Sequence, residues 1–329
     1  MKIGVTGAAG FVGTNLIDAL VAEGHDVVAI DRVRNPRVTS DRVSWAESDV
    51  MNRDSMRRAL EGVDQVFHLV AMITLRMQDP LAWRVNTEGV RNVAEAALAV
   101  GARRFVHISS VHSFDQEICG PVLNENSPRS ERPKIPVYDR SKWAGEQELR
   151  KVIDKGLDAT ICNPTGIWGP VEYATGKWSR LNGIARDAAR GLVPAFISDA
   201  VFDIVDVRDV VAGAMLAAEK GRTGENYLLG GEYQPLIEWA RLNARVAGRR
   251  GPLIGVPLSA LSAIMPVAEP ICAALGSDVL SRATLNALSA APRVDYSKAE
   301  LELGYTPRTV ERSVRDFVSF LIQSGQLDR

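Results

Sequence analysis

The sequence predicts an α/β fold: a doubly wound parallel sheet, covered by helices on both faces, with a smaller and discontinuous C-terminal lobe. Three observations predict this arrangement. Short apolar strand patterns alternate with helical patterns along the first half of the 329-residue chain. A turn with three closely spaced glycines separates the first strand from the first helix. After residue 163 the alternation gives way to segments rich in Gly, Pro, Trp and Ala.

The strand and helix patterns of the first half follow one another as β-α-β units. Gly24 is placed to end the first helix, and Gly101 is placed to end an Ala-rich helix later in the chain. Helices that connect strands in this way join parallel strands, so we expect one parallel sheet. The expected strands are 2–6, 26–31, 63–69, 105–109 and 159–162, and the expected helices are 11–23, 86–100 and about 138–149.

The glycine turn has the features of a dinucleotide-binding site. Gly7, Gly10 and Gly13 allow a tight turn, a close approach of the backbone to phosphate oxygens, and close packing of helix on strand. Their spacing differs from the commoner Gly-x-Gly-x-x-Gly, so the interpretation depends on an acidic residue downstream. Asp31 supplies it at the end of the second strand, where a carboxylate binds ribose hydroxyls. The predicted domain is therefore of the Rossmann type.

Asp31 also bears on the choice of cofactor. Its carboxylate repels a 2′-phosphate, which favours NAD over NADP. Arg32, Arg34 and Arg37 follow in the same loop and keep NADP as the alternative, because arginine is the residue that a 2′-phosphate site needs. We expect NAD as the cofactor.

The same patterns divide the chain into two parts. We expect a dinucleotide-binding domain at 1–163 and a substrate-binding lobe at 164–201 and 231–329. The segment at about 202–230 has the pattern of strand, helix and strand, and we expect it to complete the sheet of the first domain.

Composition excludes several classes of function. The formal net charge of -1 gives no electrostatic basis for binding nucleic acid or an anionic membrane surface. We therefore expect a small-molecule substrate as the partner. The spacings of Cys119, Cys162 and Cys272 fit neither a disulfide framework nor a zinc site, so we expect no metal and a reducing, cytoplasmic location.

No targeting or membrane segment is expected. Met1 leads directly into the first strand, without the charged and apolar regions of a secretory signal. The most apolar late stretch, 258–275, is interrupted by two prolines and a glutamate and is too short for a membrane span. We expect a buried helix or a substrate lid there, with peripheral membrane contact as the alternative.

Tyr138 and Lys142 form a Tyr-x-x-x-Lys segment on a predicted helix. Residues four apart lie on the same face of a helix, so the phenol and the ammonium are neighbours. A tyrosine titrates near about 10, and a fixed cation stabilises its phenolate and brings its pKa toward neutral pH. The pair is a candidate for proton transfer at a carbon that bears oxygen.

These motifs, with others in order along the chain, resemble the extended short-chain dehydrogenase/reductase superfamily. The resemblance is to its NAD-dependent epimerase/dehydratase, dihydroflavonol-reductase-like and 3β-hydroxysteroid dehydrogenase branch. It covers nearly the whole chain and implies a homodimer through the helices that flank Tyr138. Besides the glycine turn and Tyr-x-x-x-Lys, the motifs are residues 49–50, 68–71, 86–93, 108–110, 163–170 and 222–231.

The resemblance implies roles for individual residues. Ser110 hydrogen-bonds the substrate oxygen, Tyr138 is the acid/base, and Lys142 binds the nicotinamide ribose. Ser109 is a rival for the role of Ser110, which we prefer because the family's catalytic hydroxyl aligns with the second serine. Asn86 braces the active-site strand, although a plain helix N-cap is an equally physical reading.

The implied cofactor contacts lie in the glycine turn, at the strand ends and in the active-site helix. Cys162, next to two of them, is expected to be a small buried hydrophobe, and His107 a core histidine. The cofactor contacts are Gly7, Ala9, Gly10, Phe11, Val12, Gly13, Asp31, Arg32, Asp49, Val50, Leu69, Val70, Ala71, Asn86, Ile108, Tyr138, Lys142, Asn163, Pro164 and Gly166. The expected substrate contacts are Met72, Ser110, His112 and Trp168.

Sequence features near the predicted site indicate which of the family's reactions and substrate classes to expect. The family's sugar dehydratases place Asp-Glu after the catalytic hydroxyl, whereas Val111 and His112 follow Ser110 here, which disfavours dehydration. His112 is either a second acid/base or a loop histidine. The apolar, methionine-rich loop 71–77 favours a flat apolar substrate, and so do the aromatic residues of the lobe, Trp168, Trp178 and Phe196.

We therefore expect an NAD(P)-dependent alcohol dehydrogenase or ketone reductase that acts on an apolar substrate. A nucleotide-sugar epimerase is the first alternative, with phosphate oxygens bound by basic residues of the lobe. A non-catalytic NAD(P)-binding sensor or scaffold is the alternative from another class. The basic residues in question are Lys177, Arg180, Arg186 and Arg190, which also suit a solvated helix face.

Overall fold

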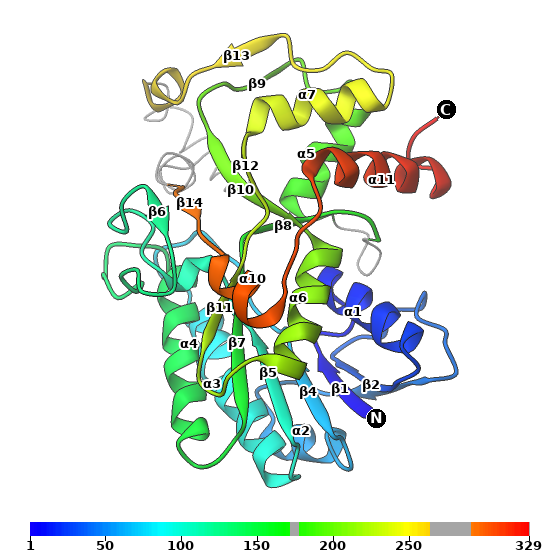
Figure 1. The fold of residues 1–329 in the computed structure, drawn as a ribbon, viewed down its shortest axis with the longest axis vertical. Helices are drawn as coiled ribbons and strands as arrows, with labels where there is room; N and C mark the ends of the chain where they lie inside the picture. Colours follow the sequence, from blue (N-terminus) through cyan, green and yellow to red (C-terminus); the bar gives the residue numbers. More distant parts are fainter. Residues whose placement is uncertain (172–177, 264–290, 329) are drawn as a thin grey trace.

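Seven parallel strands form one sheet in the lower half of the molecule (Figure 1) in the computed structural model, which describes residues 1–171, 178–263 and 291–328. The strand order is β11-β7-β5-β4-β1-β2-β3. Successive strands are added on one side of β1 up to β3 and then on its other side from β4, so the order of connection reverses between β1 and β4. Ligands of such sheets bind at this reversal, outside the carboxyl ends of the strands. The predicted parallel sheet is confirmed. Its strands are β1 Lys2–Thr6, β2 Asp26–Asp31, β3 Val43–Glu47, β4 Gln65–His68, β5 Arg104–Ile108, β7 Ala159–Pro164 and β11 Asn226–Leu229.

Helices cover both faces of this sheet. Side chains alternate between the faces along each strand: Phe67 and Val106 lie in one hydrophobic cluster, and Val66 and Phe105 lie in the other. The first cluster is closed by α1 (Phe11–Ala22), α6 (Val207–Lys220) and α10 (Ser297–Leu303). The second is closed by α2 (Arg53–Ala59), α3 (Pro80–Ala99) and α4 (Val137–Ile153).

A second lobe lies above the carboxyl ends of the strands (Figure 1). Its core gathers Trp168, Trp239 and Phe317, whose rings meet edge to face at 5.2 and 5.7 Å between centroids. The elements of this lobe are β8 Gly166–Trp168, α5 Arg180–Ala189, β9 Ala195–Ile197, β10 Val201–Asp206, β12 Glu232–Pro235, α7 Leu236–Val246, β13 Ile254–Val256 and α11 Val310–Gln323. Shorter elements beside the main sheet are η1 Val111–Ser113, β6 Val122–Leu123 and β14 Arg293–Val294.

The segment expected to complete the main sheet is divided between the two parts. Only β11 joins the seven strands, whereas β10 pairs with β8 and β12 in a separate three-stranded sheet. The C-terminal segment differs from the expected lobe as well, because Ala299 and Leu303 of α10 pack in the hydrophobic core beside the seven-stranded sheet. The second lobe therefore excludes α10, which packs with the first domain, and includes β10, which was expected in the main sheet.

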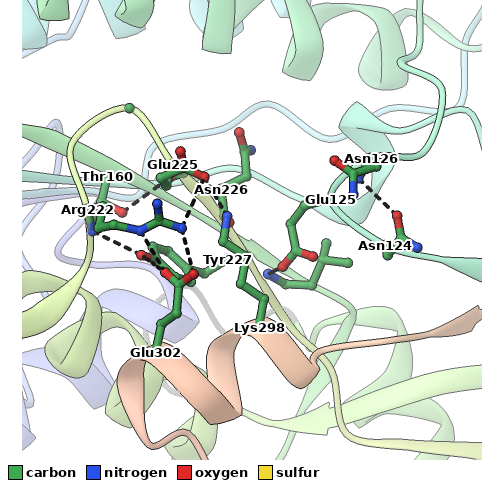
Figure 2. Close-up of polar contacts among 12 residues, drawn as sticks. Asn124, Glu125, Asn126, Thr160, Arg222, Glu225, Asn226, Tyr227, Lys298 and Glu302 are labelled. Atoms are coloured by element: carbon green, nitrogen blue, oxygen red, sulfur yellow. Dashed lines mark hydrogen bonds and ion pairs between the residues drawn. The ribbon is translucent and has the colours of Figure 1, made fainter.

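Polar contacts hold α10 against the edge strand β11 (Figure 2). Lys298 donates to Glu225 Oε2 at 2.6 Å and to the Asn226 carbonyl at 2.9 Å. Glu302 accepts from the Tyr227 hydroxyl at 2.8 Å. On the neighbouring loop, Glu125 Oε1 accepts from the Leu228 backbone N–H at 3.0 Å. The edge strand β11 is thereby covered by α10 and by the loop that carries Glu125.

Helix α3 begins earlier than the sequence pattern predicts. Asp79 is its N-cap, accepting hydrogen bonds from the Leu81 and Ala82 N–H groups, and Pro80 is the first helical residue. Asn86 therefore lies inside the helix and is not an N-cap. None of the described helices is long and apolar enough to cross a membrane. Cys272 and most of the apolar stretch 258–275 lie outside the described residues.

Candidate active site

The glycine turn forms a cradle at the start of α1. Gly7 has a left-handed φ of 75°, and a Cβ at Gly13 would clash with the Gly7 carbonyl oxygen. Gly10 is the N-cap and has no side chain to occupy the N–H groups of the first turn. Those N–H groups have no partner within a helix, so they are available for an anion. The turn, with Ala9, Phe11 and Val12 between its glycines, fits a dinucleotide pyrophosphate.

Asp31 lies beside this turn. Its Oδ2 accepts the Ala9 N–H at 3.0 Å, and its Oδ1 accepts the Arg32 N–H at 2.7 Å. The Arg32 and Arg34 side chains are exposed. The buried Asn35 anchors their loop to α1 through Thr14 Oγ1 at 3.0 Å. The carboxylate is thus held at the turn, and its binding of ribose hydroxyls stays a prediction.

The other predicted cofactor residues of the first half gather at the same edge of the sheet. The backbone of Leu69 and Val70 lies against Gly7, and Ala71 continues this loop. The carbonyl of Val50 accepts from Asn92 Nδ2 at 3.0 Å. Asp49 turns the chain after β3, with its Oδ1 accepting the Met51 N–H at 2.8 Å.

Tyr138 and Lys142 lie on the buried face of α4, facing the end of β5. Lys142 Nζ donates to the Ile108 carbonyl at 3.0 Å. Burial raises the pKa of Tyr138 to about 12, while a hydrogen bond with Ser110 acts in the opposite direction. Burial also lowers the pKa of Lys142 to about 8, against the raising effect of Glu146. The structure therefore brings the predicted acid/base, cation and serine together. The expected lowering of the Tyr138 pKa toward neutral pH is wrong for this structure, because burial raises that pKa and Lys142 does not offset it.

The two neighbouring serines point to different partners. The Ser109 hydroxyl donates to the buried Glu146 carboxylate at 2.6 Å, whereas the Ser110 hydroxyl bonds Tyr138 and accepts the His112 N–H at 3.2 Å. This difference favours Ser110 as the serine that meets the substrate oxygen.

Asn86 joins the loop after β4 to the active-site helix. Its amide clamps both sides of the Met72 peptide unit, accepting the N–H at 2.8 Å and donating to the carbonyl at 3.0 Å. The same amide donates to Ser141 Oγ at 2.9 Å. The interior position of Asn86 in α3 is therefore what allows it to brace the site.

His112 has a partner that the sequence did not indicate. Its Nδ1 lies 2.8 Å from Asp139 Oδ1, and its ring meets the Tyr138 ring edge-on at 5.4 Å between centroids. Burial opposes protonation of His112, but the Asp139 carboxylate outweighs it, so the pKa of His112 is raised. The imidazole is positioned beside the phenol as a charged or hydrogen-bonding group.

Two predicted ligand contacts lie in packed interiors instead. Trp168 is 0% exposed in the aromatic core of the lobe, where Trp178 and Phe196 also pack, so its ring stabilises the lobe and does not line a substrate site. Asn163 is equally buried, and its amide donates to the Ser110 carbonyl at 3.0 Å and to Glu146 at 2.8 Å. The Asn163 side chain is therefore engaged by Ser110 and Glu146, and its role as a cofactor contact stays a prediction.

Pro164 and Gly166, which stay predicted cofactor contacts, pack against neighbouring strands, and Cys162 and His107 lie in the core. Pro164 ends β7 beside Leu229 of β11, and Gly166 opens β8 against the Phe202 ring. Cys162 is fully buried, and burial raises the pKa of its thiol to about 12, which suits a small hydrophobe. His107 is a buried core histidine, as expected.

The basic residues considered for phosphate binding have other partners. Arg186 Nε donates to Asp187 at 2.9 Å, and Arg190 Nε donates to the Gln326 carbonyl at 2.9 Å. Lys177 lies outside the described residues. Arg186 and Arg190 are thus engaged within the lobe.

Comparison with known proteins places this architecture in a family. Residues 3–230 match the NAD dependent epimerase/dehydratase family. Sterol demethylase protein B of Methylococcus capsulatus is 32% identical over 98% of this chain and 99% of its own length. A putative dihydroflavonol 4-reductase of a Synechocystis species is 29% identical over 98% of this chain and 94% of its own. The crystal structure of gox2253 superposes with a TM-score of 0.82 at 32% identity, covering 99% of both chains. The chain belongs to the NAD-dependent epimerase/dehydratase family and is an enzyme that uses NAD.

Proposed function

We propose that this enzyme exchanges a hydride between NAD and a secondary alcohol or ketone, with Tyr138 as the acid/base. One observation carries the proposal: Tyr138, Lys142 and Ser110 converge at the carboxyl edge of the sheet where the glycine turn lies. A site that combines a dinucleotide cradle with a buried phenol and ammonium has the groups that carbinol oxidation needs.

Bound at the glycine turn, NAD would supply the hydride chemistry: its oxidised form would accept a hydride from the carbinol carbon, and its reduced form would donate one to the ketone. Because burial raises the pKa of Tyr138 to about 12, the phenol is protonated at neutral pH and is ready to act as an acid. In reduction Tyr138 gives this proton to the ketone oxygen, while Ser110 hydrogen-bonds the same oxygen. The Lys142 ammonium stabilises the phenolate that remains. Oxidation runs the same proton transfer in reverse.

An apolar loop beside Tyr138 supports an apolar substrate. The loop 71–77 is pinned to the start of α4, because Val137 N–H donates to the Arg76 carbonyl at 3.0 Å and Arg140 donates to the Met77 carbonyl at 2.6 Å. Ile73 is 74% exposed and Met77 is 44% exposed. Such side chains suit a flat apolar ligand better than a hydroxyl-rich sugar. The names of the two relatives, a sterol demethylase protein and a dihydroflavonol reductase, support the same class.

The two alternatives have less support. A nucleotide-sugar epimerase needs cations on a diphosphate, and Arg186 and Arg190 already pair within the lobe. A non-catalytic sensor has no need of an intact Tyr138 and Lys142 pair buried beside a serine. His112, held by Asp139, and Met72, held by Asn86, are the further residues that we assign to the substrate side of the site.

Absorbance of reduced nicotinamide tests the proposal. Purified enzyme with NAD or NADP is offered hydroxysteroids, aromatic secondary alcohols and UDP-sugars. We expect net reduction of NAD by an apolar alcohol, and slower reduction of NADP because of the Asp31 carboxylate. Interconversion of a UDP-sugar without net change in the cofactor would contradict the dehydrogenase proposal and move the enzyme to the epimerases.

We also propose that the enzyme is a homodimer that pairs through α3 and α4, which lie side by side on the outside of the sheet (Figure 1). Leu81 and Trp83 support this pairing, because these large apolar residues near the start of α3 are 54% and 38% exposed.

A further inference from the structure

Helix α4 carries a second charged residue, besides Lys142, on its buried face. Glu146 lies one turn after Lys142 and has no exposed surface. Its Oε1 accepts from Ser109 Oγ at 2.6 Å and Asn163 Nδ2 at 2.8 Å, and its Oε2 accepts from Asn226 Nδ2 at 3.0 Å. A carboxylate accepts on both oxygens and donates none, so these donors match its ionised form.

A cation completes the surroundings of this carboxylate. Arg129 Nη1 lies 3.5 Å from Glu146 Oε2. Removing a charge from water costs roughly several kcal/mol unless protein partners replace the water. Three hydrogen-bond donors and the Arg129 guanidinium are such partners for Glu146. The buried Glu146 carboxylate is therefore stabilised by the fold.

Glu146 belongs to a network that reaches three strands. Ser109 follows β5, Asn163 lies in β7, and Asn226 begins β11. Asn226 also donates to Asn163 Oδ1 at 2.8 Å and accepts from Arg150 Nη2 at 2.6 Å. Figure 2 shows Asn226 beside the contacts that hold α10 to β11. The carboxylate thus joins α4 to three of the seven strands.

This network ends on the segment that bears the catalytic serine. Lys142 holds the Ile108 carbonyl, Glu146 holds the Ser109 hydroxyl, and Asn163 holds the Ser110 carbonyl at 3.0 Å. Three consecutive residues are therefore fixed to α4, two of them directly and one through Asn163.

We propose that Glu146 is a positioning residue of the active site: it fixes residues 108–110 against α4 so that Ser110 and Tyr138 bind one substrate oxygen, and it places a negative charge one helical turn from the Lys142 ammonium. This inference rests on the function proposed above. Glu146 raises the pKa of Lys142 against the lowering effect of burial. The other titratable or charged groups around the pair are Glu125, Arg129, Arg150, His68, His107, His112, Tyr138 and Asp139.

Glu146→Gln tests both parts of the proposal. The amide keeps the size of the side chain but removes the charge, and it turns an N–H group toward donors that need an acceptor. We expect the titration of Lys142, followed by ¹³Cε NMR and assigned with Lys142→Met, to move to lower pH by roughly one unit. We expect kcat to fall by about 10²-fold because the serine segment shifts. The Kd of NAD should stay within a few fold.

Glu148→Gln is the matched control. Glu148 lies on the same helix but pairs at the surface with Lys151 and Arg91. This variant should leave both the Lys142 titration and kcat unchanged. A purely structural role of Glu146 would lower stability without moving the Lys142 titration.

Ser109→Ala keeps the proposal testable if Glu146→Gln does not fold. It removes one donor but leaves the charge, so kcat should fall while the Lys142 titration stays in place. An unchanged kcat in the Ser109 variant, or an unmoved Lys142 titration in a folded Glu146→Gln, would overturn the inference. The NMR titration needs no substrate, so a wild type without alcohol turnover would refute the proposed function and leave the effect of Glu146 on Lys142 measurable.

Discussion

His68 and His107 occupy neighbouring positions on β4 and β5, with their rings stacked 5.3 Å apart in the interior of the sheet. Burial, with the nearby Lys142, lowers the pKa of His68 to about 3 and that of His107 well below its ordinary value. Only Thr6 Oγ1, at 2.7 Å from His68 Nδ1, offers the described pair a side-chain hydrogen bond. Both rings are neutral in the folded enzyme.

This pair makes stability depend on pH. The unfolded chain takes up protons as pH falls through about 6.5, whereas the folded rings do not, so stability is lost below that pH. The expected slope is about 1.4 kcal/mol per pH unit for each histidine. His107→Leu should reduce the loss between neutral pH and about pH 5, as measured by urea unfolding. An equal loss in the variant and the wild type would show that His107 is not responsible.

At the scale of elements, the active site depends on the close approach of α3 and α4. Gly145 permits it, because a Cβ there would clash with the Asn86 carbonyl oxygen. The Asn86 amide then reaches Ser141 on α4 and the Met72 peptide on the loop after β4. The position of Tyr138 relative to its loop is thus set by the packing of two helices.

Gly145→Ala should therefore disturb the site from a distance. Forcing the helices apart is expected to cost about 1–3 kcal/mol in the free energy of unfolding and to lower kcat. Gly183→Ala is the matched control, because Gly183 is also helical and its Cβ would have no neighbour nearer than 3.9 Å. The control should keep its activity and gain up to about 1 kcal/mol from helix propensity. Equal activity and stability in the two variants would refute the packing argument.

Local sequence patterns predicted most helices and strands of the first domain. The sheet that a strand joins depends on tertiary contacts, which such patterns do not contain. The glycine turn, Asp31 and the Tyr138–Lys142 pair were predictable because spacing along one strand or helix determines them. Asp79 and Pro80, a cap followed by a first-turn proline, mark the start of α3 in the sequence. The Ala-rich apolar pattern begins later and predicted a start at residue 86. The strand β10 was assigned to the wrong sheet, because an apolar strand pattern does not identify its neighbours.

The directions of side chains were harder to predict. Trp168 and Asn163 lie in motifs of the family, yet their partners come from distant parts of the chain: Trp239 and Phe317 for one, Glu146 and Asn226 for the other. A charged residue on the buried face of an amphipathic helix was the available signal for Glu146, which stands four residues after Lys142.

At the scale of the whole molecule, the proposed dimer is open to a direct test. Trp83→Glu places a charge on the apolar surface of α3 that we assign to the pairing. We expect a dimer for the wild type and a monomer for the variant in sedimentation-velocity experiments. Leu301→Glu is the control, because Leu301 is 86% exposed on α10, which packs on the opposite face of the sheet from α3 and α4. A wild-type monomer, or a variant that still dimerises, would contradict the proposed interface.

The most direct test of the central claim is the turnover of Tyr138→Phe, measured beside its affinity for NAD. The change removes one hydroxyl from a buried ring and leaves the glycine turn and Asp31 untouched. We predict that kcat falls by about 10²- to 10⁴-fold, the usual contribution of a general acid or base, while the Kd of NAD stays within a few fold. Unchanged turnover in this variant would contradict the assignment of Tyr138 as the group that carries the proton.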